Sequence, residues 1–401
     1  MTSVKRVFPV LTVLFLGYLG YSLVIPLFPP LFLDPIHGFL PDDLSQGKRR
    51  ILLGMLFAMY PLGQLVGAPF LGKLSDNYGR KPILLLSLLI VIPTYLSSAC
   101  AVFFTFPLLL YIGRFFSGLL EGNIVIAQAA IADISEDTET KTKHFSWLVC
   151  LSSTAFFFGP LIGGKLADSS IVSWFHFNTP FWGAAVLTFI GFFIVLSLFK
   201  ETHTPDREMK VSIRAIAKNF TGGLRYKRLH MIYWANLFVF LSLFFYLNLF
   251  TAYLVARFQF PVSMLGKFYA YLSLPFIIAP IFFRIFKRWT SKQSMCFGSL
   301  CLSISYLIFV VPPSPRALLI TLVPLGFFQS MGFAFPALMV SDVVGKKEQG
   351  IALGTNQSIQ VFAEAATALV GGFLLALETT VPIYAAAACA LIASSILFIR
   401  R

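Results

Sequence analysis

Residues 72–82 read GKLSDNYGRKP. This short, basic stretch separates two long apolar runs, at 50–71 and 82–104. A helix needs about 20 apolar residues to cross the hydrocarbon core of a bilayer, and both runs reach that length. We therefore predict two membrane-spanning helices joined by a short connection at one face of the membrane.

The same pattern extends along the whole chain of 401 residues, which is 57% hydrophobic and only 12% charged. The apolar runs lack the two-residue alternation of membrane barrel strands, so every span is expected to be a helix. We predict an all-α membrane protein with twelve transmembrane helices. The expected ranges are 7–33, 50–71, 82–104, 107–132, 145–167, 179–199, 230–255, 264–286, 293–312, 316–341, 351–377 and 381–399.

Most of the 31 Lys and Arg residues lie in the tails and in alternate connections. By the positive-inside rule, this bias predicts that both termini are cytoplasmic. The longest inside connection, 200–229, contains the basic amphipathic stretch REMKVSIRAIAKNF, which we expect to lie on the membrane surface as an interfacial helix. It separates a predicted N-terminal six-helix bundle, 1–199, from a C-terminal one, 230–401.

The two sets of six helices resemble diverged copies of each other. APFLGKLSDNYGRK at 68–81 aligns without gaps to APIFFRIFKRWTSK at 279–292. Further matches at nearly the same spacing are Gly163 with Gly371, Gly164 with Gly372, and Asp133 with Asp342. Internal repeats are expected in transporters whose halves move around a site near the bilayer midplane. We therefore predict two pseudo-symmetric bundles.

The residue types of the 72–82 stretch suit a structured connection. Gly72 and Gly79 permit close packing and a left-handed backbone turn. Asp76 suits the N-terminus of a neighbouring helix, and Arg80 suits an ion pair with an acid such as Asp133. The alternative is a generic basic loop with no specific partner.

The stretch resembles the signature loop of the major facilitator superfamily. Five segments, together with an acidic ETH after the sixth helix, are similar to the tetracycline-efflux proteins and other twelve-helix drug:proton antiporters, mainly over residues 10–203. These segments are GYSLVIPLFPPLF, GQLVGAPFLGKLSDNYGRKPILLLSLL, YIGRFFSGLLEGNIVIAQAAIADIS, FFFGPLIGG and TPFWGAAVLTFIGFF. The resemblance implies the major facilitator fold and alternating access between two bundles around a central cavity.

The resemblance also implies a gating role for the loop. It implies that Asp76 contacts the start of helix 11 and that Arg80 links to Asp133, which locks the outward-open state. The second copy has Lys287 at the position of Asp76, so one latch is expected rather than two.

The stretch FFFGPLIGG at 156–164 resembles the antiporter motif of the same group. Small residues and a proline remove side-chain bulk and one backbone donor, so helix 5 can bend and approach helix 8 closely. A packing role and a gating role are both open. The residues concerned are Gly159, Pro160, Gly163 and Gly164.

Charged residues interrupt the apolar run at 107–132. A charge at the centre of a membrane helix costs about 2.5 to 3.5 kcal/mol if it faces lipid. Since seven residues make about two helical turns, Arg114, Glu121 and Gln128 are expected to share one face that points at protein or water.

We interpret Glu121 as a proton carrier that Arg114 tunes, because hydration and a nearby cation change the proton affinity of a buried carboxylate. The alternatives are a static buried Arg–Glu network and charge recognition of the substrate without protons. Helix 11 carries a second midspan acid, Glu364, which either shares in the coupling or makes a hydrogen bond between the bundles.

The substrate is not identified by the sequence. Tetracycline-efflux proteins carry an aspartate in helix 1 where this chain has Gly17, and their helix-3 aspartate falls near Thr94. Aromatic and amide side chains are predicted to line the cavity, with simple packing as the alternative. They are Tyr18, Tyr21, Trp234, Tyr246, Gln128, Gln357 and Gln360.

No Walker loop, nucleophile triad or metal-ligand cluster occurs, so we predict neither an enzyme nor a cofactor or metal site. The predicted function is a secondary active transporter that exports a small amphipathic or cationic compound in exchange for protons, as a monomer in a bacterial inner membrane and without nucleic acid. One alternative is a proton-coupled symporter or facilitator for a nutrient or metabolite, such as an amino acid or organic acid. Another is a non-transporting receptor or lipid-handling protein.

Overall fold

The computed structural model describes residues 3–135, 137–204, 225–345 and 348–399. Over these residues the regular structure is helical, and twelve segments are long and apolar enough to cross a membrane. The predicted all-α fold with twelve spans is confirmed, and the chain is a multi-pass membrane protein. The interfacial helix expected within 200–229 lies outside the described residues.

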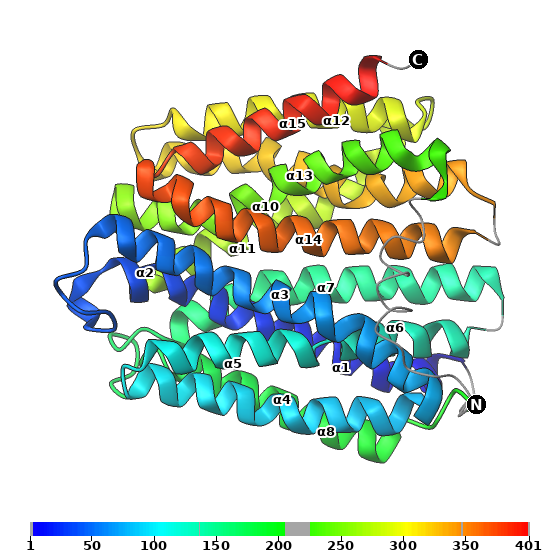
Figure 1. Ribbon diagram of the computed structural model, residues 1–401, viewed down its shortest axis with the longest axis horizontal. Coiled ribbons are helices and arrows are strands. Elements are labelled where there is room, and N and C mark those ends of the chain that lie inside the picture. The colour runs from blue at the N-terminus through cyan, green and yellow to red at the C-terminus, as the bar shows by residue number, and fades with distance from the viewer. Residues whose placement is uncertain (1–2, 136, 205–224, 346–347, 400–401) are drawn as a thin grey trace. The chain divides into compact units, whose positions relative to one another are not determined.

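The helices follow the predicted order (Figure 1). In the first half they are α1 (Ser3–Val24), η1 (Ile25–Leu27), α2 (Phe28–Leu33), η2 (Pro35–His37), α3 (Gln46–Tyr78), α4 (Arg80–Phe103), α5 (Pro107–Leu120), α6 (Asn123–Ile134), α7 (Thr138–Leu166) and α8 (Thr179–Leu198). In the second half they are η4 (Lys227–Leu229), α10 (His230–Phe258), α11 (Val262–Phe282), η5 (Phe283–Phe286), α12 (Ser291–Val310), α13 (Pro315–Val343), α14 (Gln349–Leu377) and α15 (Val381–Ile399).

The fourth span is not one continuous helix. The expected helix at 107–132 is divided into α5 and α6, which are separated by Glu121 and Gly122. Gly122 lies against the backbone of α3, where an added Cβ would be only 2.9 Å from the Cα of Ala68 and from the carbonyl oxygen of Gly67. The break therefore places a carboxylate at the end of α5, near the middle of the span.

The chain forms two compact units. The first comprises the described residues of 1–42, 59–204 and 261–270, and the second comprises those of 43–58, 225–260 and 271–401. Each unit therefore takes a short segment from the other half of the sequence: the start of α3 joins the second unit, and the start of α11 joins the first. The sequence boundaries 1–199 and 230–401 stay a prediction.

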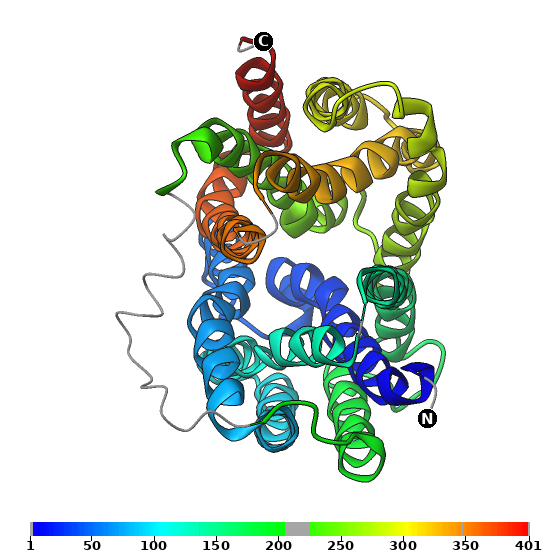
Figure 2. The same ribbon diagram turned by 90° about the vertical axis from the view of Figure 1, so that its right-hand side faces the viewer.

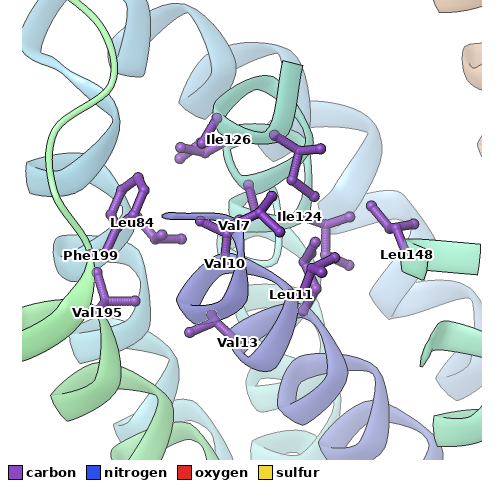
Figure 3. Packing of buried hydrophobic residues seen from close by; sticks show 14 of the residues in the cluster. Val7, Val10, Leu11, Val13, Leu84, Ile124, Ile126, Leu148, Val195 and Phe199 are labelled. Atoms are coloured by element: carbon purple, nitrogen blue, oxygen red, sulfur yellow. The ribbon is translucent and has the colours of Figure 1, made fainter. Parts of the chain in front are cut away.

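In the first unit, α1 packs against α7 and α8, while α4 packs against α5 and α8. One end of this unit contains a buried aliphatic cluster around the start of α1 (Figure 3). Its labelled members are Val7, Val10, Leu11 and Val13 from α1, Leu84 from α4, Ile124 and Ile126 from α6, Leu148 from α7, and Val195 and Phe199 at the end of α8. These contacts hold α6 in place directly after the break.

In the second unit, α10 packs against α13, α14 and α15, and α12 packs against α13 and α15. Figure 2 shows the helices approximately along their axes. The core of this unit contains packed aromatic rings: Tyr246 is stacked on Phe250 at 5.0 Å and lies tilted against Tyr306 at 5.1 Å, measured between ring centroids. Tyr246 is fully buried.

Candidate functional site

The 72–82 motif is mostly helical rather than a loop. Helix α3 continues to Tyr78, and α4 begins at Arg80, so only Gly79 lies between them. Gly79 has a φ of 101°, a conformation that favours glycine. Gly72 is less constrained, because a Cβ there would meet only Val125, at 3.6 Å. The motif is therefore a helix end and a one-residue turn.

Arg80 is buried and forms the ion pair that the sequence suggested. Its Nε donates to Oδ2 of Asp133 at 3.1 Å, and its Nη1 donates to Oγ of Ser75 at 2.7 Å and to Oδ1 of Asp76. The guanidinium thus joins the end of α3 to α6, the second part of the fourth span. Whether this contact gates transport stays a prediction.

Glu201 completes this cluster, and sequence reasoning gave it no role. Its Oε1 accepts from the backbone N–H of Arg80 at 2.9 Å, and its Oε2 accepts from that of Lys81 at 3.0 Å. The N–H groups of Thr202 and His203 also donate to Oε1. Partial burial acts to raise the pKa of Glu201, but the four N–H groups outweigh it and lower the pKa. The carboxylate caps the start of α4.

The second half has a weaker version of the same contact. In the repeat alignment Ser291 takes the place of Arg80, and its hydroxyl donates to Oδ2 of Asp342 at 2.5 Å. Asp342 is the residue that aligns with Asp133. The two copies therefore place the same pair of positions in contact, with an ion pair in one and a neutral donor in the other.

Glu121 lies at the helix break and is 3% exposed. Its Oε1 accepts a hydrogen bond from the hydroxyl of Tyr95 on α4 at 3.0 Å. Its Oε2 is buried and has no hydrogen-bond partner among the described residues. Beside it, the hydroxyls of Thr94 and Ser117 lie 2.8 Å apart and link α4 to α5.

Arg114 is also buried, at 3% exposure, and it is surrounded by aromatic rings. The guanidinium carbon lies 4.9 Å from the ring centre of Tyr60, 5.4 Å from that of Phe28 and 5.5 Å from that of Tyr21. Desolvated cation–π contacts of this kind are worth about 2 kcal/mol each. Gln128 is partly exposed and lies on α6, beyond the break, so helical periodicity does not relate it to Arg114.

Partly exposed aromatic residues of α1 and α7 lie close together in the first unit. Tyr18 and Tyr21 on α1 both contact Phe156 on α7, each with ring centres 6.0 Å apart, and Tyr21 lies 4.3 Å from Tyr60. These positions are compatible with the predicted cavity lining.

The residues of the second unit that were predicted to line the cavity or to share in proton coupling differ in their burial. Tyr246 is packed in the aromatic core with no exposed surface, so the expectation that it lines a cavity is wrong for this structure. Trp234 is 60% exposed. On α14, Gln357 is exposed, while Gln360 and Glu364 are partly buried. The carbonyl of Glu364 accepts from the side-chain amide of Asn248 at 3.3 Å, which ties α14 to α10.

The glycines of the 156–164 motif allow α7 to approach two other helices closely. A Cβ on Gly159 would collide with the side chain of Ser22, and one on Gly163 would collide with the carbonyl of Leu23, so both bring α7 close to α1. A Cβ on Gly164 would lie 2.8 Å from the carbonyl oxygen of Val262. The predicted approach to helix 8, which is α11, is therefore made by part of the motif only.

The same approach is present from the α11 side. A Cβ on Gly266 would collide with the carbonyl of Pro160. Just beyond α7, Asp168 accepts hydrogen bonds from Ser170 and from Ser263, which lower its pKa, and Lys267 lowers it further. Backbone packing and a polar contact thus join the end of α7 to the start of α11.

Comparison with known proteins gives matches over most of the chain. The family model described as Major Facilitator Superfamily matches residues 10–293 and 270–401. The class B tetracycline resistance protein of Escherichia coli is 28% identical over 383 residues, which cover 94% of this chain and 88% of that protein. Multidrug resistance protein 2 of Bacillus subtilis is 26% identical over 379 residues, which cover 92% and 88%.

Solved structures share the fold. The D-xylose–proton symporter superposes with a TM-score of 0.76 at 15% identity, over 99% of this chain and 97% of that one. The human organic anion transporter MFSD10 superposes with a TM-score of 0.72 at 20% identity, over 99% and 100%.

Proposed function

The chain belongs to the Major Facilitator Superfamily, and from that premise we propose that this membrane transporter exports a small amphipathic or cationic compound in exchange for protons. The observation that carries the proposal is the buried carboxyl of Glu121 in the middle of the fourth span. The printed names of the relatives, tetracycline and multidrug resistance proteins, support export of a small organic compound.

The position of Glu121 supports proton exchange. The span covers Pro107–Ile134, and Glu121 lies close to its centre, where an ionised carboxylate is costly. Tyr95 donates to one of its oxygens, while the other lacks a partner among the described residues. A carboxyl in this setting is easier to bury neutral than charged, and hydration on opening of a cavity reverses that preference. Proton binding and conformation are therefore coupled.

The surroundings of Glu121 favour a substrate with aromatic and cationic character. The partly exposed rings of Tyr18, Tyr21 and Phe156 offer flat apolar surfaces that also attract cations. A deprotonated Glu121 near this surface attracts a cation through the low-dielectric interior. In the proposed cycle, binding of a proton to Glu121 and binding of a substrate cation are mutually exclusive.

The remaining parts of the proposal concern movement and orientation. The Arg80–Asp133 contact and the glycine approach of α7 to α11 are the proposed gating elements at the two ends of the first unit. The proposed location is a bacterial inner membrane, with both termini in the cytoplasm and the monomer as the working unit. The Lys and Arg distribution supports this orientation.

The test uses purified protein in proteoliposomes that contain a pH-sensitive dye, with tetracycline and tetraphenylphosphonium as probes. Export coupled to protons moves protons and probe in opposite directions. Glu121→Gln is expected to abolish the coupled proton movement while leaving the elution profile and thermal stability unchanged. The matched control is Glu378→Gln, an exposed acid at the end of α14, which should behave as wild type.

Two results would contradict the proposal. Coupled proton movement at the wild-type rate in Glu121→Gln would remove Glu121 from the mechanism. Proton and probe movement in the same direction would identify a symporter instead, which is the alternative within the same fold.

A further inference from the structure

The hydrogen bond between Tyr95 and Glu121 lies where α4 meets the junction of α5 and α6. Both side chains are enclosed, with 1% of Tyr95 and 3% of Glu121 exposed, and the hydroxyl donates to Oε1 at 3.0 Å. Among the described residues, Tyr95 is the only hydrogen-bond donor to this carboxyl. Because water does not compete in such a place, one hydrogen bond to a carboxylate has a large effect.

Both partners are held in position by backbone packing. The break after Glu121 is fixed because Gly122 lies against α3, next to Gly67 and Ala68. The Tyr95 hydroxyl lies in the space that Gly20 leaves on α1, where a Cβ would be 3.6 Å from the hydroxyl oxygen. The geometry of the hydrogen bond is therefore set by three helices besides the one that carries Glu121.

Other charged or titratable groups are close but do not replace this contact. Tyr18 on α1 interacts electrostatically with Glu121, and Arg114 on α5 interacts electrostatically with Tyr95. On α3, the residues nearest to Gly122 at the break are Gly67, Ala68 and Leu71, which do not titrate. Tyr95 thus interacts with both the proposed proton carrier and the arginine.

We propose that Tyr95 is a positioning residue for proton exchange: its hydroxyl orients the Glu121 carboxyl and sets the pH at which that carboxyl releases its proton. This inference rests on the proposed function, since it assumes that Glu121 carries the proton. The hydroxyl donates to the carboxylate more strongly than to the neutral acid, and so favours release. Tyr95 keeps its own proton throughout.

Removal of the hydroxyl has a defined consequence. In Tyr95→Phe the ring stays in place, but the carboxylate loses its donor. The proton is then held more tightly, and the pH of half-deprotonation rises by about one unit, a tenfold change in proton affinity. The pH profile of tetraphenylphosphonium transport should move upward by the same amount.

Infrared difference spectroscopy of the membrane-reconstituted protein tests the inference directly. The carbonyl stretch of the protonated Glu121 is the band that disappears in Glu121→Gln. In Tyr95→Phe this band should move to higher frequency, because its carbonyl no longer accepts a hydrogen bond, and should titrate at higher pH. Tyr111→Phe, which removes a hydroxyl from α5, the helix that ends directly before Glu121, is the matched control and should leave the band unchanged.

The possible outcomes separate this inference from the proposed function. If Glu121→Gln removes no titrating carboxyl band, the proposed function fails. If it does, but the band keeps its frequency and midpoint in Tyr95→Phe, the positioning role of Tyr95 is overturned and proton carriage by Glu121 stands. Glu121→Asp shortens the side chain away from Tyr95 and should shift the midpoint in the same direction, so the test does not depend on one variant folding.

Discussion

Arg80 connects two helices through its contact with Asp133. The sequence repeat provides a second, aligned contact with which it can be compared. Asp133 is an acid bound by an arginine, whereas the aligned Asp342 is bound by a serine hydroxyl. Hydrogen bonds to charged groups are worth about 1.5 to 3 kcal/mol when the partner is also charged and less when it is neutral. Replacing the aspartate by asparagine in each copy therefore compares an acid bound by an arginine with an acid bound by a serine hydroxyl.

Asp133→Asn is expected to destabilise the protein by about 1 to 3 kcal/mol, because it leaves the buried Arg80 with a weakened acceptor set. Asp342→Asn should cost about 1 kcal/mol or less, since it weakens one exposed hydrogen bond from an uncharged donor. Thermal unfolding in detergent measures both. Equal losses in the two variants would show that the ion pair adds nothing to the fold.

Because the pKa of Glu201 is lowered in the folded protein, we expect the free energy of unfolding to depend on pH. Its pKa in the folded protein is lowered, so its contribution is complete above the ordinary Glu value of about 4.3 and is lost as the pH falls through the folded value. Glu201→Gln should therefore lower the unfolding temperature most at pH 7, and the difference from wild type should shrink below about pH 4. Parallel unfolding scans from pH 7 to pH 3 provide the measurement; a difference that grows on acidification would contradict the capping role.

Among the helices, the junction of α5 and α6 depends on the absence of a side chain at Gly122. Gly122→Ala should destabilise the protein by about 1 to 3 kcal/mol, because the added methyl group meets the backbone of α3. Gly183→Ala on α8 is the control: its Cβ would make an ordinary contact, 3.6 Å from Leu166, so better helix propensity should stabilise the protein by about 0.5 to 1 kcal/mol. Unfolding in detergent distinguishes the two signs.

The sequence predicted some of these elements better than others. The twelve spans follow from their length and hydropathy alone. The Arg80–Asp133 contact followed from complementary charges and a family resemblance. The break at Glu121 was missed, because a glycine in an apolar run is common in continuous membrane helices and only the approach of α3 reveals its role. Tyr95 was missed because nothing in the sequence states the rotation of α4 relative to α5.

The cap made by Glu201 had a weak signal. The acidic ETH after the sixth span contributed only to the family resemblance, and the partner of Glu201 is more than a hundred residues away. The opposite error concerns Tyr246, which was predicted to line the cavity as an aromatic residue of a span although its ring lies in the aromatic core. Burial of this kind is decided by packing between helices, which composition does not specify.

For the transporter as a whole, the proposed gating role of the contact between the end of α7 and the start of α11 requires that this contact separates during the transport cycle. A disulfide in Asp168→Cys/Ser263→Cys, made in a background without the five native cysteines, should stop transport, and a reductant should restore it. Each single-cysteine variant serves as a control. Transport at the wild-type rate by fully cross-linked protein would show that this contact stays closed during the cycle.

The single residue between α3 and α4 has a mechanical consequence. Gly79 is the only residue between the two helices, and Glu201 accepts hydrogen bonds from the first two N–H groups of α4. The connection is therefore short and held in place. A tilt at the end of α3 must therefore move the beginning of α4. Since Tyr95 lies on α4 and donates to Glu121, movement at this end of α3 would be transmitted through α4 to the Glu121 carboxyl.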